Sequence, residues 1–117
     1  KINDNSIINN ANIVKVITKE KITNKNFPEA FNFVRKLNEK KEKYLYHHIG
    51  IYAYQSEILK EIVNLKQSNN EMKNNLEQLR ALDNGLKINV ALAKVSPVGI
   101  DTMEDYLDLK KKLEYKA

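Results

Sequence analysis

The sequence lacks cysteine and tryptophan, and it has only three glycines and two prolines in 117 residues. Without cysteine the chain forms no disulfide, no thiolate metal site and no cysteine nucleophile, which fits a reducing compartment. The glycines are too widely spaced for a phosphate-cradling loop, and the common Gly-rich, zinc-protease and serine-hydrolase motifs are missing. No apolar run approaches the roughly 20 residues of a membrane-spanning helix, and the polar first residues do not resemble a signal peptide. We therefore expect no membrane partner.

Arginine is also scarce. The chain has 20 basic and 15 acidic residues, a net charge of +5, yet only Arg35 and Arg80 are arginines. Apart from two short runs, at 40–43 and 110–112, the lysines are scattered, which is typical of a solvated surface and predicts no nucleic-acid partner. Because this sequence uses lysine wherever a plain positive charge suffices, the two arginines are candidates for specific contacts.

What is present predicts a single α/β domain with a hydrophobic core, since 42% of the residues are hydrophobic. Strands are expected at residues 13–18, 48–54 and 87–93, where β-branched or alternating apolar residues gather. Residues 28–45 are ambiguous, because the spacing of Phe31, Val34 and Leu37 suits a helix whereas residues 31–34 also alternate as in a strand.

Three helices are expected from apolar stripes and end signals. The first begins at Ser56 as N-cap, with a stripe at Ile58, Leu59, Ile62, Val63 and Leu65. A polar loop at 66–70 leads to the second, with a stripe at Met72, Leu76, Leu79 and Leu82, and with Gly85 just past its end. The third follows a Thr102–Asp105 capping box, with inward residues expected at Met103, Tyr106, Leu107 and Leu113.

Two polar groups could bind a ligand. In the expected strand 48–54, His48 and Tyr52 share a face on either side of Gly50, which leaves a notch where a ligand could approach. The alternative is a histidine at a strand edge and a glycine that accommodates a neighbouring element. Glu77 and Gln78 leave an apolar helix stripe together, and a carboxylate beside an amide suits a ligand rich in hydroxyls. The alternative there is a solvated helix face.

A third candidate is Asp101, at a junction that leads into a helix. Such an aspartate commonly caps the helix, but it could also ligate a hard divalent cation. One carboxylate holds Mg²⁺ poorly, so further ligands would have to come from elsewhere.

Three segments together resemble one family. HIGIYAY at 48–54, LEQLR at 76–80 and GIDTMED at 99–105 occur in the order and at the spacing found in 3-deoxy-manno-octulosonate (Kdo) cytidylyltransferase, the CMP-Kdo synthetase of lipopolysaccharide biosynthesis. Residues 10–16 and 30–35 resemble further segments of that family, and the second of these favours a strand at 30–34. The resemblance covers only the C-terminal part of the family.

The resemblance implies an α/β nucleotidyltransferase fold with a mixed, Rossmann-like sheet flanked by helices. It also implies a cytoplasmic, usually homodimeric enzyme that transfers a cytidylyl group from CTP to Kdo. By this resemblance the Kdo pocket is lined by His48, Tyr52, Glu77 and Gln78, with Arg35 on the same side. Asp101 would be a Mg²⁺ ligand.

The sequence also departs from the family. Val34 stands where the family usually has serine, Asn74 replaces a glutamate, and the two prolines before the LEQLR segment are missing. The resemblance further implies that residues 1–117 are a single incomplete domain without the N-terminal nucleotide-binding part. We therefore expect the chain to act with such a part. The alternative is a catalytically inactive fragment that serves as a sugar-binding or assembly module.

Overall fold

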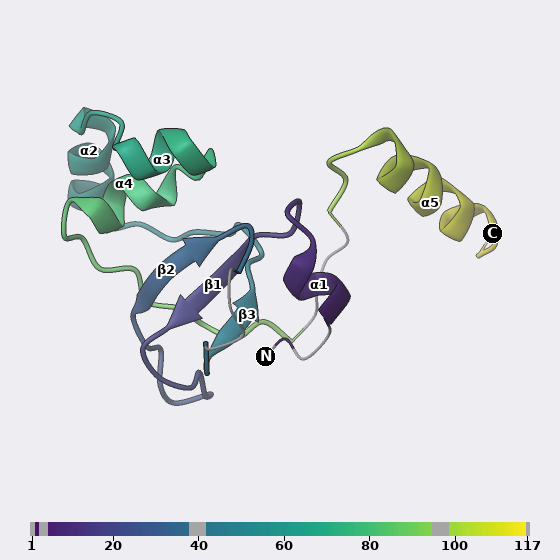
Figure 1. Cartoon of the computed structure of the whole chain (residues 1–117), viewed down its shortest axis with the longest axis horizontal. Coiled ribbons are helices and arrows are strands. Elements are labelled where there is room, and N and C mark those ends of the chain that lie inside the picture. The colour runs from purple at the N-terminus through teal and green to yellow at the C-terminus, as the bar shows by residue number, and fades with distance from the viewer. Residues whose placement is uncertain (1, 3–4, 38–41, 95–98, 117) are drawn as a thin grey trace.

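The structure of the chain is a computed structural model that describes residues 2, 5–37, 42–94 and 99–116. Within this part, helices and strands follow one another in a mixed α/β order (Figure 1). The elements are α1 (Asn5–Asn9), β1 (Lys15–Thr18), β2 (Ala30–Val34), β3 (Leu45–His47), α2 (Ser56–Asn64), α3 (Asn69–Asn74), α4 (Gln78–Asp83) and α5 (Met103–Glu114). The predicted α/β class is confirmed.

The strands form one antiparallel sheet with β1 in the middle, in the order β2-β1-β3. Val16 on β1 lies opposite Phe33 on β2 and Tyr46 on β3. All four residues of β1 are buried, because both faces of the sheet are covered. The expected strands at 13–18 and 30–34 are thus confirmed, the second in favour of the strand rather than the helix.

Two hydrophobic clusters cover the two faces of this sheet, since the neighbouring side chains of Val16 and Ile17 point to opposite sides. The first cluster, on the side of Val16, joins the sheet to α4; it contains Val16, Ile22, Ala30, Phe33, Tyr46, Leu76 and Leu79. The second, on the side of Ile17, is smaller and packs against α1; it contains Ile2, Ile17 and Leu45, with Ile7 and Ile8 partly buried beside it. Figure 1 shows α4 and α1 on different sides of the sheet.

Two expected strands are wrong. The strand expected at 48–54 does not form: β3 ends at His47, and residues 48–55 have no regular secondary structure, with Gly50 at a positive φ of 70° that does not continue a strand. The segment expected to be a strand at 87–93 has one isolated bridge, between Asn89 and Glu29. Its backbone hydrogen bonds reach only residues 28 and 30, through Val90 and Ile88.

The expected second helix is two short helices, α3 and α4. Asn75 ends α3 in the left-handed conformation, with φ 50° and ψ 52°, and this breaks the continuous stripe. α3 begins earlier than expected, after a capping box in which Ser68 and Glu71 bond each other's backbone N–H. Gly85 lies just beyond α4 with a φ of 76°, as expected.

The first and last helices also differ from expectation. Gln55, rather than Ser56, is the N-cap of α2, and neither α2 nor α5 buries a residue. The Thr102–Asp105 capping box of α5 is confirmed, but the residues expected to point inward from α5 are exposed: Met103, Tyr106, Leu107 and Leu113. Figure 1 shows why, since α5 lies away from the sheet.

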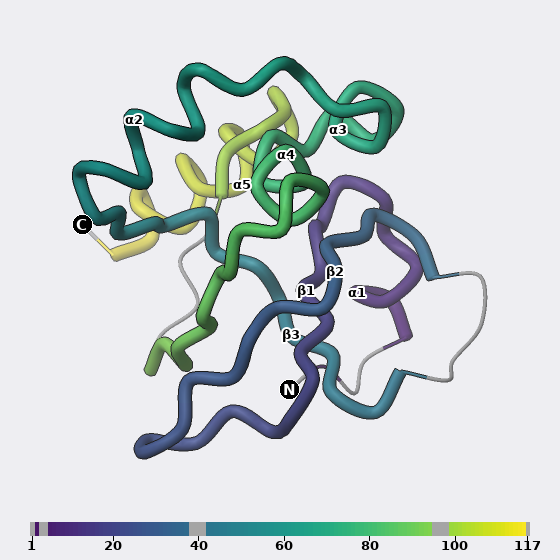
Figure 2. Tube along the Cα trace, turned by 90° about the vertical axis from the view of Figure 1, so that its left-hand side faces the viewer, coloured from purple at the N-terminus to yellow at the C-terminus, as the bar shows by residue number. Residues whose placement is uncertain are grey.

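The same arrangement is visible from the side in Figure 2, where β1, β2 and β3 run next to one another beneath α4. None of the helices in the described part of the chain combines the length and apolarity that crossing a membrane requires.

Candidate functional site

His48 and Tyr52 come together on either side of Gly50, in a segment without regular secondary structure. Nε2 of His48 lies 2.7 Å from the hydroxyl of Tyr52, within hydrogen-bond distance. The imidazole also packs edge-on against Phe33 of β2, with 5.3 Å between ring centroids and 79° between planes. Tyr52 in turn stacks on Tyr54, with centroids 5.9 Å apart. The structure thus brings together the two side chains that the sequence paired, although not through strand alternation.

The electrostatics of this pair favour uncharged side chains. Burial lowers the pKa of His48, and the nearby Glu77 carboxylate opposes that effect in part. Burial also raises the pKa of Tyr52, and Glu77 adds to that increase. His48, Tyr52 and Glu77 together are called the corner. Near neutral pH the corner thus presents a neutral imidazole, a phenol that keeps its proton, and the charge of Glu77, which acts on both.

Glu77 and Gln78 begin α4, whose apolar side packs into the first cluster. Leu76 and Leu79 are buried on either side of the pair, so the start of this helix is fixed against the sheet. Glu77, the N-cap residue, is exposed, whereas Gln78 is only 6% exposed. Among the described residues, the Nε2 atom of Gln78 is buried and has no hydrogen-bond partner. An unpaired buried amide donor costs about 1–3 kcal/mol.

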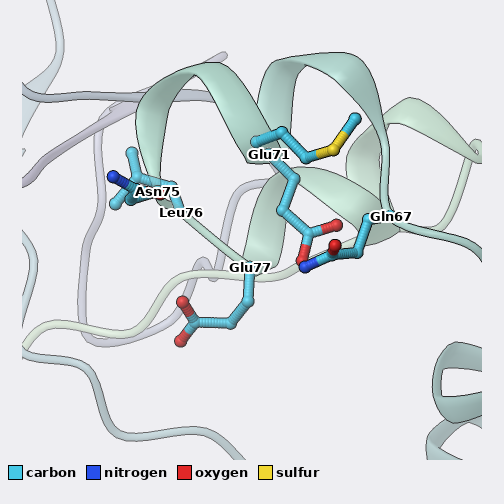
Figure 3. A pocket seen from close by; sticks show the side chains of 6 residues that line it. Gln67, Glu71, Asn75, Leu76 and Glu77 are labelled. Carbon is cyan, nitrogen blue, oxygen red and sulfur yellow. The ribbon is translucent and has the colours of Figure 1, made fainter.

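An open hollow of about 410 Å³ borders Glu77 on the side of α3. It is lined by Gln67, Glu71, Met72, Asn75, Leu76 and Glu77. Figure 3 shows the carboxylate of Glu77 directed away from Glu71 and Gln67. Glu71 is committed within the chain, because its carboxylate accepts two hydrogen bonds from Arg80, at 2.5 and 2.8 Å. That contact lowers the pKa of Glu71. Glu77 is thus the carboxylate of this hollow that is available to a ligand.

Arg35 directly follows β2 and contacts the backbone that precedes Glu77. Its Nε donates to the carbonyl of Asn74 at 2.8 Å and its Nη2 to that of Asn75 at 3.0 Å. Sequence patterns did not predict this role, because they carry no information on contacts between residues 39 or 40 positions apart.

Asp101 is exposed and lies just before α5, the helix that Figure 1 shows away from the sheet. The neighbouring Asp105 is occupied by the capping box, where it accepts hydrogen bonds from Thr102. In the described part of the chain, no group of three or more acidic, histidine or cysteine residues could hold a metal ion. Among the described residues, Asp101 therefore offers a carboxylate for Mg²⁺ but no complete site surrounds it.

Sequence reasoning missed two residues near the corner. Phe33 supports the His48 ring, and Lys15 is completely buried beneath Arg35. A signal for Lys15 existed, because a lysine inside a run of β-branched residues is unexpected in a strand buried on both faces.

No family model matches the chain, but individual relatives do. It is 43% identical over 110 residues to 3-deoxy-manno-octulosonate cytidylyltransferase of Bacteroides thetaiotaomicron, a match that covers 86% of this chain and 42% of that protein. The protein of the same name from Bartonella tribocorum is 39% identical over 100 residues, covering 86% of this chain and 40% of the relative.

A solved structure agrees. CMP:2-keto-3-deoxy-manno-octonic acid synthetase complexed with CTP superposes with a TM-score of 0.66 at 28% identity, over 92% of this chain and 44% of that one. The fold and these matches define the class first: over most of its length the chain is similar to nucleotidyltransferases that act with cytidine nucleotides. The family is that of 3-deoxy-manno-octulosonate cytidylyltransferase, to which the chain belongs over most of its own length. It spans about two fifths of the length of the relatives it matches.

Proposed function

We propose that this chain forms the sugar side of a cytidylyltransferase that joins CTP to Kdo. In this reaction the anomeric hydroxyl of Kdo forms a bond to the α-phosphorus of CTP, the bond to the β-phosphate oxygen breaks, and pyrophosphate leaves with the hydroxyl proton released. The proposal rests on the names of the relatives and on one observation in this molecule, the unpaired buried amide of Gln78.

The corner described above offers complementary groups to a sugar acid. The Nε2 donor of Gln78 would bond a sugar hydroxyl, and the Glu77 carboxylate would accept from another. His48 and Tyr52 would face the anionic end of the sugar, where an imidazole that gains a proton makes a charge-assisted hydrogen bond. These side chains bind and orient the sugar, and such positioning is a large part of catalysis in a transfer between two bound substrates.

Asp101 is proposed to supply one carboxylate oxygen to Mg²⁺, as the family resemblance implies. When bound, this ion offsets the charge of the triphosphate. Its remaining ligands would come from CTP, water and a part of the protein outside this chain, since the Asp105 carboxylate beside Asp101 is engaged by the capping box and the described residues hold no metal-binding cluster. We place the CTP pocket in that same part, and the assembled protein in the cytoplasm.

A sugar-binding module without catalytic activity is the second candidate. The observation that favours it is the extent of the match. Two fifths of a relative's length can contain the sugar side of the site without the nucleotide side. Both candidates require Kdo to bind this chain, so binding is the first experiment.

Titration calorimetry with Kdo tests the sugar site through a substitution of nearly unchanged shape. Gln78→Met removes the unpaired amide, so we expect the free energy of unfolding to rise by about 1 kcal/mol while Kdo affinity falls at least tenfold. His47→Ala, at the exposed neighbour of His48, is the control and should keep the wild-type affinity. Equal Kdo binding by Gln78→Met and the wild type would contradict the proposal, as would a wild type that does not bind Kdo.

A further inference from the structure

The segment that carries Glu77 and Gln78 is tied down by a cation from another part of the chain. The guanidinium of Arg35 donates to three backbone carbonyls: those of Asn74, Asn75 and, at 3.4 Å, Ala11. Its planar set of N–H groups suits such a bridge, because several donors point outward in fixed directions. Arg35 thereby joins the end of α3 to the segment before β1.

A second cation supports the first. Lys15 is fully buried, and its Nζ donates to the carbonyl of Arg35 and to that of Asn10, both at 2.5 Å. Burial and the neighbouring charge of Arg35 both lower the pKa of Lys15, so this arrangement carries an energetic penalty. Each hydrogen bond that the described residues form with either cation goes to a main-chain carbonyl. Lys15 therefore holds the backbone at Asn10 and Arg35, and Arg35 holds it at Ala11, Asn74 and Asn75.

The backbone that Arg35 holds is a left-handed turn. Asn75 adopts a φ of 50°, a conformation that asparagine enters less readily than glycine but more readily than most other residues. Directly after it, Leu76 enters the core, and Glu77 and Gln78 begin α4. The direction in which these two polar side chains leave the helix thus depends on the carbonyls of Asn74 and Asn75.

We propose that Arg35, supported by Lys15, is a positioning residue that sets the turn at Asn75 and thereby aims Glu77 and Gln78 at the sugar. The effect on Kdo affinity in this inference rests on the proposed function. It differs from a direct contact between the Arg35 charge and the sugar carboxylate, which the family resemblance alone would suggest.

The conservative variant separates these two roles. Arg35→Lys keeps the positive charge but cannot bridge carbonyls in several fixed directions, so positioning predicts that Kdo affinity falls roughly tenfold or more, as it does in Arg35→Gln. A direct ionic contact predicts that Arg35→Lys retains most of the affinity and that only Arg35→Gln loses it. Retained affinity in Arg35→Lys would overturn the inference.

A matched control accounts for lost stability. Leu45→Ala removes a buried side chain from the second cluster, on the face of the sheet opposite α4. We expect this variant to unfold at a lower urea concentration than Arg35→Lys and still bind Kdo as the wild type does, because the turn at Asn75 is untouched. A weakening of Kdo binding in Leu45→Ala as large as that in Arg35→Lys would assign the effect to stability and contradict positioning.

A readout without sugar keeps the inference testable if Kdo does not bind. In ¹⁵N spectra of the 117-residue chain, Arg35→Lys and Lys15→Met should both shift the amide signals of Asn75, Leu76 and Glu77 and leave those of α5 in place. Unchanged signals at these three residues would overturn the inference. Shifted signals combined with no Kdo binding by the wild type would refute the proposed function alone.

Discussion

His48 makes the stability of this molecule depend on pH near neutrality. Burial holds the pKa of its imidazole below the ordinary value of 6.5, so the unfolded chain takes up a proton at a higher pH than the folded chain does. Stability from this residue is therefore complete above about pH 6.5 and is lost as pH falls below it. We expect the free energy of unfolding, measured with urea, to decrease between about pH 7 and 5.5. His48→Gln should remove most of that slope.

The neighbouring histidine provides the control for this prediction. His47 is exposed at the end of β3, so His47→Gln should keep the wild-type slope. The carboxylates with lowered pKa, among them Glu71 and Asp105, lose their contribution only at a lower pH. A slope in His48→Gln equal to that of the wild type would show that burial of His48 does not set the pH dependence.

At the scale of residues, the structure tests how the predicted site residues meet, not whether they bind a ligand. His48 and Tyr52 are within hydrogen-bond distance, and, after burial, the charge of Glu77 acts to raise the pKa of both. The unpaired amide of Gln78 was not foreseeable, because hydrogen-bond satisfaction depends on atoms distant in sequence.

At the scale of elements, two capping boxes of the same design should have different effects on stability. The Ser68 box starts α3, which is bound to α4 through the Glu71–Arg80 ion pair, whereas the Thr102 box starts α5, which buries no residue. Ser68→Ala should lower the free energy of unfolding of the sheet by about 1 kcal/mol. Thr102→Ala should leave it unchanged and reduce only the helical circular-dichroism signal.

Each of these two variants is the control for the other. Unfolding of the sheet is followed through tyrosine absorbance, since Tyr46 is buried in the first cluster, and helix content is followed in the far ultraviolet. The same loss of sheet stability in both variants would mean that α5 is coupled to the core.

Two of the elements that the sequence predicted wrongly contain a residue with positive φ. It is Gly50 in the alternating segment 48–54 and Asn75 in the apolar stripe across residues 72–82. A positive φ changes the direction of the chain without changing its polarity pattern, so periodicity cannot reveal it. The strand at 15–18 and the capping box at Thr102 were predictable because their signals are local.

At the scale of the whole molecule, the extent of the match predicts incomplete activity. The described part of the chain offers the proposed sugar corner and the exposed carboxylate of Asp101, but no metal cluster. Incubated with CTP, Kdo and Mg²⁺, the chain alone should release no pyrophosphate above background. Addition of the N-terminal half of a relative such as that of Bacteroides thetaiotaomicron should restore release.

The restored reaction has a specific control. Gln78→Met in the same mixture should require more Kdo for half-maximal release than the wild type does, with the CTP requirement unchanged. Release of pyrophosphate by the chain alone would contradict the prediction of incompleteness, and a failure of the added half to restore release would favour the binding-module alternative.

The central place of β1 has a consequence for synthesis of the chain. Of the three strands, β1 comes first in the sequence, yet both of its edges pair with strands that follow it. On the ribosome, β1 therefore emerges with both edges unpaired and stays so until β2 and then β3 have been synthesised. During that interval the nascent segment is a template for pairing with other chains. Lys15 precedes the apolar pair Val16 and Ile17, and Lys19 lies two residues after it. The charges of these lysines oppose such association.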